Sequence, residues 1–397
     1  DFCLSRGLGD VYKRQDLEPG FRVGDPGELS LLAEDVLTEV LERWYDEADE
    51  SFIRFADNYA TAKSDAPIAQ MVQNLYTFST SYPWPQEWLQ SLCVPYEPDR
   101  LTPEALASDD SWLQELLVYL HAVLRGERAQ MELARRLCEE PDGPDMYLDN
   151  ISYVIGQMER LDTVSDYDEL GRAIDAVDFG RLGVRRGFTG DKGMQELVKS
   201  LRTQVKDELQ KLHKKYFART LAEQAEDLVI TGQAVRVLAK LTMDYADAYS
   251  RQKQERGLLD FSDIEHMALR ILVDGQTKEP TGVAREFQSL FEEVMIDEYQ
   301  DSNYVQEAIL SAVSGGDGRD NCFMVGDVKQ SIYRFRLARP ELFMEQYDTY
   351  TEEASPCRKV CLKQNFRSRS QVLDSVNDLF YRIMQRDVGG VEYDRDA

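Results

Sequence analysis

The chain has 397 residues, with 46 lysines and arginines against 73 aspartates and glutamates, so its formal net charge is −27. This length predicts two or three domains, and a hydrophobic content of 43% excludes a wholly disordered chain. No apolar run approaches the ~18 residues of a membrane span, no secretion signal opens the chain and six scattered cysteines suggest no disulfide framework, so we expect a cytoplasmic protein without membrane association.

Charge is unevenly distributed along the chain. Residues 25–57 contain eleven acidic and two basic residues, whereas residues 181–219 contain eleven basic and four acidic ones. The total charge therefore describes solubility better than any one surface, and it does not exclude a nucleic-acid partner. Taken alone, however, the basic stretch is more simply interpreted as a solvated helix face.

The first two thirds of the chain predict helices. Residues 1–15 have no hydrophobic period and resemble translated adapter sequence, so we expect a non-native leader there. From residue 28 to about 275, apolar residues recur at three- and four-residue steps, as in Leu29, Leu32, Val36 and Val40. Long helices are predicted over 196–221 and 224–249.

The pattern changes after residue 285. Short apolar runs at 294–296, 322–325 and 360–362 have the length of strands. Helical patterns lie between and after them, at 303–313, 340–350 and 370–384. This alternation indicates a parallel sheet in an α/β domain. The polar residues that follow each run would lie at the carboxyl edge of the sheet, where ligands bind in such folds.

The first of these edges carries two adjacent carboxylates, Asp297 and Glu298. Phosphoryl transfer needs one acid to hold Mg²⁺ and a second group to orient or deprotonate the attacking water. An ordinary acidic strand end is the alternative, and it is common in a chain this acidic.

Aromatic and basic residues alternate after the second run, in Tyr333, Arg334, Phe335 and Arg336. Aromatic rings stack on unpaired bases and arginines neutralise phosphates, which is the combination used by single-strand binders. The alternative is that Tyr333 and Phe335 belong to the core of the following helix. After the third run, Arg367 has the position of a phosphate-binding arginine with an aromatic neighbour, Phe366, although a plain surface arginine is equally compatible.

In this order the three segments, 297–301, 326–336 and 365–368, resemble motifs II, III and IV of the superfamily 1 helicases of the UvrD/Rep type. Upstream, the run 259–263 looks like the Leu-Asp-Phe-x-Asp element of that family. Residues 323–347 and the acidic opening from Phe21 look most like the A subunits of the AddAB helicase–nucleases. The resemblance implies a helix-rich α/β fold: an incomplete RecA-like, parallel-sheet P-loop NTPase domain that carries a large all-helical insertion.

The resemblance also implies ATP and Mg²⁺ as cofactors and a role for each matching residue. Asp297 would coordinate Mg²⁺, and Glu298 would activate water. Gln330 would contact the γ-phosphate and link it to DNA. Arg367 would bind the same phosphate, and Phe366 would stack on adenine, where many relatives have tyrosine.

DNA contacts are implied for Tyr333, Phe335 and Arg336 and, in the upstream element, for Asp260 and Phe261. The expected ligands are single-stranded DNA and duplex ends. The expected protein partner is a B-type helicase/nuclease subunit in a heterodimer.

The implied layout places the helical insertion at 16–255, the second part of the first RecA-like domain at 256–355 and the start of a second at 356–397. The expected function is that of an ATP-dependent DNA helicase and exonuclease in double-strand-break processing and recombinational repair. The sequence contains no Gly-x-x-x-x-Gly-Lys-Ser/Thr loop to cradle the phosphates, so we expect an internal fragment that is inactive alone. A catalytically inactive helicase-like scaffold is the alternative, although the retained acids, Gln330 and Arg367 favour the motor.

Overall fold

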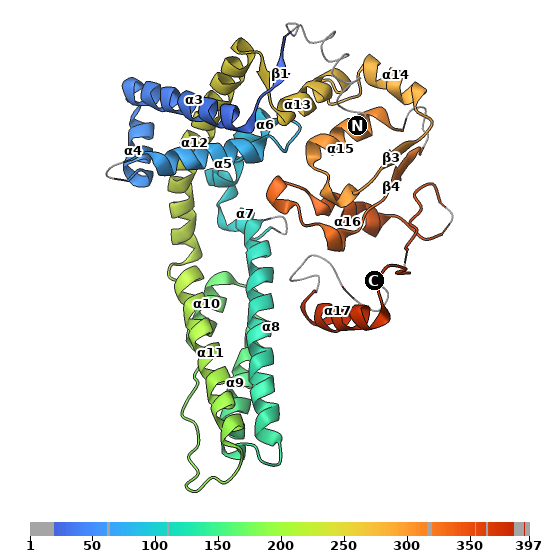
Figure 1. The fold of residues 1–397 in the computed structure, drawn as a ribbon. Helices are drawn as coiled ribbons and strands as arrows, with labels where there is room; N and C mark the ends of the chain where they lie inside the picture. Colours follow the sequence, from blue (N-terminus) through green and yellow to red (C-terminus); the bar gives the residue numbers. More distant parts are fainter. Residues whose placement is uncertain are drawn as a thin grey trace. The chain divides into compact units, whose positions relative to one another are not determined.

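The computed structural model describes residues 20–61, 64–108, 111–315, 320–353, 355–362, 364–384 and 393 (Figure 1). The expected leader, residues 1–15, lies outside these ranges. The chain divides into two compact units: Val94–Gln233 forms one, and Asp1–Cys93 together with Ala234–Ala397 forms the other. None of the described helices is both long enough and apolar enough to cross a membrane.

The unit Val94–Gln233 is helical throughout its described residues. Its long helix α8 packs against α9 and α11, and α10 packs against both of these (Figure 1). The elements in chain order are η1 (Val94–Tyr96), η2 (Pro98–Arg100), α7 (Pro103–Leu106), α8 (Trp112–Glu139), η3 (Asp145–Tyr147), α9 (Leu148–Leu161), α10 (Tyr167–Asp175), α11 (Lys192–Tyr216) and the first part of α12 (Leu221–Glu255).

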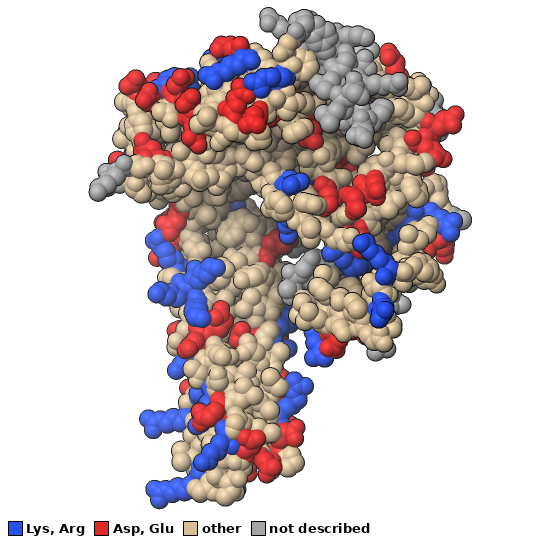
Figure 2. Space-filling view, viewed as in Figure 1, with Lys and Arg blue, Asp and Glu red and all other residues tan. Residues whose placement is uncertain are grey.

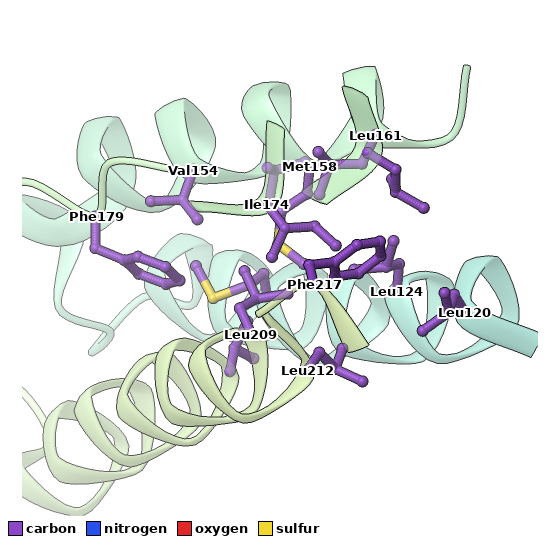
Figure 3. Packing of buried hydrophobic residues seen from close by; sticks show 14 of the residues in the cluster. Leu120, Leu124, Val154, Met158, Leu161, Ile174, Phe179, Leu209, Leu212 and Phe217 are labelled. Atoms are coloured by element: carbon purple, nitrogen blue, oxygen red, sulfur yellow. The ribbon is translucent and has the colours of Figure 1, made fainter. Parts of the chain in front are cut away.

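Buried leucine, valine, isoleucine and aromatic side chains from these helices point toward one another and form one core (Figure 3). α10 approaches α11 closely because Gly171 has no side chain: a Cβ there would lie 2.7 Å from the Phe217 ring. The helix α11 begins at Lys192, before the predicted residue 196, because the side chain of Asp191 caps it by accepting from the backbone amides of Gly193 and Met194.

The second unit opens with α3 (Pro26–Glu47), α4 (Glu50–Tyr59), α5 (Ala66–Ser79) and α6 (Pro85–Ser91). Apolar faces of α3, α4 and α5 share a core with residues 237–249 of α12. A two-stranded parallel sheet joins the two ends of this region, with β1 (Arg22–Val23) paired to β2 (Leu258–Leu259). This pairing brings the segment before α3 to the start of the Leu-Asp-Phe element.

The rest of this unit surrounds a second parallel pair. β3 (Val294–Ile296) pairs with β4 (Cys322–Met324) in the register Val294↔Cys322, Met295↔Phe323 and Ile296↔Met324. Helices α13, α14 and α15 pack together over a small apolar core. The helices of this region are α13 (Phe261–Leu272), α14 (Gly282–Leu290), α15 (Tyr304–Val313), α16 (Pro340–Thr349) and α17 (Ser370–Ile383).

The structure confirms the predicted helices at 303–313, 340–350 and 370–384 and the two neighbouring strands, and it corrects two other predictions. The run 360–362 forms no strand, because no described backbone segment pairs with it and its side chains Val360 and Leu362 are exposed. Leu258–Leu259 is a strand inside the stretch that was predicted to be helical.

The division into two compact units also groups α3–α6 with the sheets, whereas the sequence grouped them with the later helices. The domain boundaries at 255 and 355 remain predictions.

Candidate functional site

The acidic pair lies where β3 ends. Glu298 has a left-handed backbone, with φ 51° and ψ 41°, which turns the chain out of the strand into the short helix η4 (Tyr299–Asp301). A left-handed residue other than glycine costs roughly 1–2 kcal/mol, and such strain concentrates at functional sites. Asp297 Oδ1 accepts from the Glu298 backbone amide at 3.0 Å, and both carboxylates are exposed.

The residue after the next, Gln300, is only 1% exposed and connects the two predicted motifs. Its side-chain Nε2 donates to Glu298 Oε2 at 2.6 Å, and its Oε1 accepts from the Asp327 backbone amide at 3.0 Å. The strand ladder continues at this edge, since Tyr299 N donates to Val325 O at 2.9 Å. The segments 297–300 and 325–327 are therefore side by side.

Gln330 lies on the one-turn helix η6 (Val328–Gln330) that follows β4. Asp327 caps this turn: its Oδ1 accepts from the Lys329 backbone amide at 3.1 Å, and its Oδ2 accepts from Gln330 Nε2 at 3.0 Å. Lys329 Nζ also lies 3.3 Å from Asp327 Oδ1. The structure thus brings Glu298 and Gln330 into one hydrogen-bonded chain through Gln300 and Asp327.

The aromatic and basic residues of the second motif lie on the surface. Tyr333 precedes the turn η7 (Arg334–Arg336), and its ring centroid is 5.8 Å from that of Phe335. The Arg336 guanidinium lies 5.0 Å and 5.6 Å from these two ring centroids. Phe335 is 76% exposed, which excludes the alternative that this ring belongs to the core of the following helix. The exposed rings are available for stacking.

Asp260 and Phe261 have different surroundings. Asp260 is the N-cap of α13, where it forms a capping box with Asp263. Both carboxylates also bind Lys253, whose Nζ lies 2.7 Å from Asp260 Oδ2 and 2.6 Å from Asp263 Oδ2 and whose side chain is 2% exposed. Burial, and then the charge of Asp260, raises the pKa of Asp263. Phe261, the first residue of the helix, is exposed.

Phe366 and Arg367 lie apart from these residues. Phe366 is 91% exposed, and the loop is turned by Asn365, whose Oδ1 accepts from the backbone amides of Arg367 and Ser368. In the described part of the chain no hydrogen bond, ion pair or ring contact joins Phe366 or Arg367 to the acidic pair or to Gln330.

In the unit Val94–Gln233, acidic partners neutralise part of the basic stretch 181–219. Arg185 pairs with Asp145, Lys211 with Glu208 and Arg219 with Asp227. Lys206 and Lys214 form no ion pair within the described residues. Figure 2 shows lysines and arginines interspersed with acidic residues on the visible face of this unit.

Sequence reasoning missed three residues that shape the site. Gln300 and Lys253 received no role, because their partners become evident only when the fold brings them together. The third, Arg339, lies over the rings of Phe78, Tyr82 and Tyr304, 5.0 to 5.5 Å from their centroids. Its backbone amide donates to Ser302 O at 2.8 Å, so it ties the end of the aromatic segment to the loop after η4.

Comparison with known proteins agrees with this geometry. Residues 109–351 match the UvrD/REP helicase N-terminal domain, and the chain belongs to this family. Curated relatives that match all of the chain are named as the A subunits of ATP-dependent helicase/nucleases. The protein of Lachnoclostridium phytofermentans is 42% identical over 408 residues, that of Moorella thermoacetica 40% over 406 and that of Bacillus velezensis 38% over 408. The chain spans 29%, 28% and 32% of their respective lengths.

Proposed function

We propose that this chain forms part of the motor of an ATP-dependent DNA helicase/nuclease, in which hydrolysis of Mg·ATP drives translocation on single-stranded DNA. The observation that carries the proposal is the linkage of Glu298 to Gln330 through Gln300 and Asp327 at the carboxyl edge of a parallel sheet. Ligands bind at this edge in open α/β sheets. The relatives' printed names support the same activity.

The acidic edge has the donor chemistry that Mg²⁺ requires. Asp297 and Glu298 offer exposed carboxylate oxygens, which are hard ligands. Mg²⁺ in nucleotide sites takes one or two carboxylates and completes its shell with water and phosphate, so a larger protein cluster is not needed. In this proposal Asp297 holds the ion and Glu298 accepts the proton of the attacking water. The bound ion would neutralise charge on the phosphates.

The remaining nucleotide contacts come from Gln330, Arg367 and Phe366. We assign Gln330 and Arg367 to the γ-phosphate and Phe366 to the adenine. The exposure of Phe366 and the separation of its loop from the acidic edge are consistent with a second RecA-like domain that joins the site when nucleotide binds. A Walker A loop, which this sequence does not contain, would have to come from elsewhere in the longer protein.

DNA would bind at two kinds of surface. Tyr333, Phe335 and Arg336 would stack on and neutralise single-stranded DNA, and Phe261 would add a further ring. Asp260 would serve this surface by capping the helix that presents Phe261. Basic side chains of the stretch 181–219 would contact phosphates.

In the full-length protein, this motor would act in double-strand-break processing and recombinational repair. The proposed partner is a B-type helicase/nuclease subunit, which is consistent with the naming of the relatives as A subunits. The unit Val94–Gln233 would form the centre of a helical insertion in the first RecA-like domain. The incomplete RecA-like assignment for β3 and β4 rests on their parallel register and on the family.

The acidic pair provides the test of this function. In the full-length protein, Glu298→Gln should retain Mg·ATP binding and lose most of its ATP turnover, because only the proton acceptor is removed. Asp297→Ala should also weaken Mg·ATP binding, because the metal ligand is lost. Equilibrium binding of a fluorescent ATP analogue, together with steady-state hydrolysis, separates the two. Equal turnover in wild type and Glu298→Gln would remove Glu298 from the mechanism, and absence of turnover in the wild type would support the scaffold.

A further inference from the structure

We propose that Gln300 is a positioning residue that fixes the carboxylate of Glu298 and connects it to the turn that carries Gln330. The inference rests on the proposed ATPase function and extends it to a side chain that no motif role covers. Gln300 would not touch nucleotide or metal. It would act through Glu298 on one side and through Asp327 on the other.

The two hydrogen bonds of Gln300 define the orientation of its amide. Glu298 Oε2, when ionised, can only accept, so the group 2.6 Å away must be the NH₂ of Gln300. The Asp327 backbone amide can only donate, so the group 3.0 Å away must be the carbonyl oxygen. A flipped amide would face a donor with a donor and an acceptor with an acceptor. The contact to a carboxylate is charge-assisted and therefore stronger than a neutral hydrogen bond.

The packing around the amide is as specific as its hydrogen bonds. Gln300 is 1% exposed, so an unpaired amide there would be costly. Gly326 provides the space on the β4 side: a Cβ at that position would lie 2.5 Å from Gln300 Oε1 and 3.0 Å from Phe343 Cε2. No φ in the left-handed range requires this glycine, so the close approach of Gln300 explains it.

The consequence is a short mechanical link between two proposed nucleotide contacts. Glu298 alone is exposed and has a flexible side chain, and Gln300 restrains it. The other end of the amide holds the backbone of Asp327, whose carboxylate caps the turn and binds Gln330 Nε2. A displacement of Gln330 by a phosphate would thus reach the proposed base through two side chains.

Four variants of the full-length protein test this assignment by steady-state hydrolysis of Mg·ATP with saturating single-stranded DNA. Gln300→Leu removes both hydrogen bonds. Gln300→Glu keeps the shape and the acceptor for Asp327 but replaces the donor to Glu298 with a carboxylate. We expect both to lower kcat by about tenfold to a hundredfold, the cost of a misplaced catalytic group, with little change in KM. Gly326→Ala should have the same effect from the opposite side, and Tyr299→Phe should not.

Tyr299→Phe is the matched control because Tyr299 is a buried neighbour in the same turn whose hydroxyl bonds to Glu307 at 2.6 Å and not to Glu298. A second control combines each Gln300 variant with Glu298→Gln. A residue that acts through Glu298 has no further effect once the base is gone, whereas a merely structural fault would lower kcat again. Wild-type kcat in Gln300→Glu, or an equal further loss in the Glu298→Gln background, would overturn the positioning role. Wild-type turnover in Glu298→Gln alone would instead refute the proposed function.

Discussion

Lys253 holds its ammonium group between two carboxylates in a setting nearly closed to solvent. Asp260 and Asp263 both accept from it, and the ring of Tyr249 lies 4.5 Å from its nitrogen. The same two acids form the capping box that begins α13, directly before the exposed Phe261. One buried cation therefore stabilises the helix end that presents a proposed DNA contact.

Replacing this cation should be costly. Lys253→Met leaves two buried carboxylates without their partner, and we expect the free energy of unfolding to fall by about 3–5 kcal/mol in urea titrations. Arg54→Met in the same unit removes only the exposed pair with Glu50 and should cost about 0–1 kcal/mol. Equal effects of the two substitutions would show that the Lys253 cluster contributes no more than a surface ion pair.

Phe335 gives a second prediction at this scale. Phe335→Ala should weaken binding of single-stranded DNA by about 1–3 kcal/mol while the salt dependence stays the same, because stacking neutralises no phosphate. Fluorescence anisotropy at several salt concentrations measures both quantities. Leu290→Ala, which removes an exposed apolar side chain from α14, should change neither. Unchanged affinity in Phe335→Ala would refute stacking by this ring.

Single residues also show where sequence reasoning reached its limit. Asp297 and Glu298 could be predicted as an edge pair because an apolar run ends directly before them. The role of Gln300 could not, since one of its partners lies 27 positions later and only the parallel register of β3 and β4 brings them together. The exposure of Phe335 was left open, because alternation of aromatic and basic residues fits both a surface turn and a buried helix.

The elements themselves were predictable in proportion to their length. Long helices such as α8 and α12 have many turns over which an apolar period shows, and their positions were predicted. The two-residue strands β1 and β2 have no period and were missed. The prediction of a strand at 360–362 was wrong, since apolarity indicates burial potential but only a paired neighbour makes a strand.

The packing of α8 can be tested on one helix. Leu120 is fully buried in the core that α8 shares with α9 and α11, whereas Val118 on the same helix is exposed. Leu120→Ala should lower the free energy of unfolding by about 2–5 kcal/mol through reduced burial and a residual cavity. Val118→Ala should have little effect in the same denaturation experiment. A comparable decrease in both variants would contradict the assigned core face.

At the scale of the whole molecule, the net charge of −27 coexists with local basic surface. Lys206 and Lys214 have no described ion-pair partner, whereas Lys211 is paired with Glu208. If the stretch 181–219 binds phosphates, removing one lysine–phosphate interaction should reduce the slope of log K against log salt by about 0.7 for single strands. The double variant Lys206→Ala, Lys214→Ala should therefore flatten the salt dependence of DNA binding more than Lys211→Ala. An unchanged slope would leave this stretch as a solvated helix face.

The central claim is that a motor couples the nucleotide edge to DNA through the segment from Gln330 to Phe335. Gln330 lies on the capped turn directly before the exposed aromatic cluster, so a phosphate contact there would shift the rings through a few backbone bonds. The nucleotide acts as a switch only if it binds the closed and open states differently.

The most direct measurement is the stimulation of ATP hydrolysis by single-stranded DNA in wild-type and Gln330→Ala full-length protein. We predict strong stimulation in the wild type and a large loss of it in the variant, with DNA affinity in the absence of nucleotide nearly unchanged. Wild-type stimulation in Gln330→Ala would contradict the coupling.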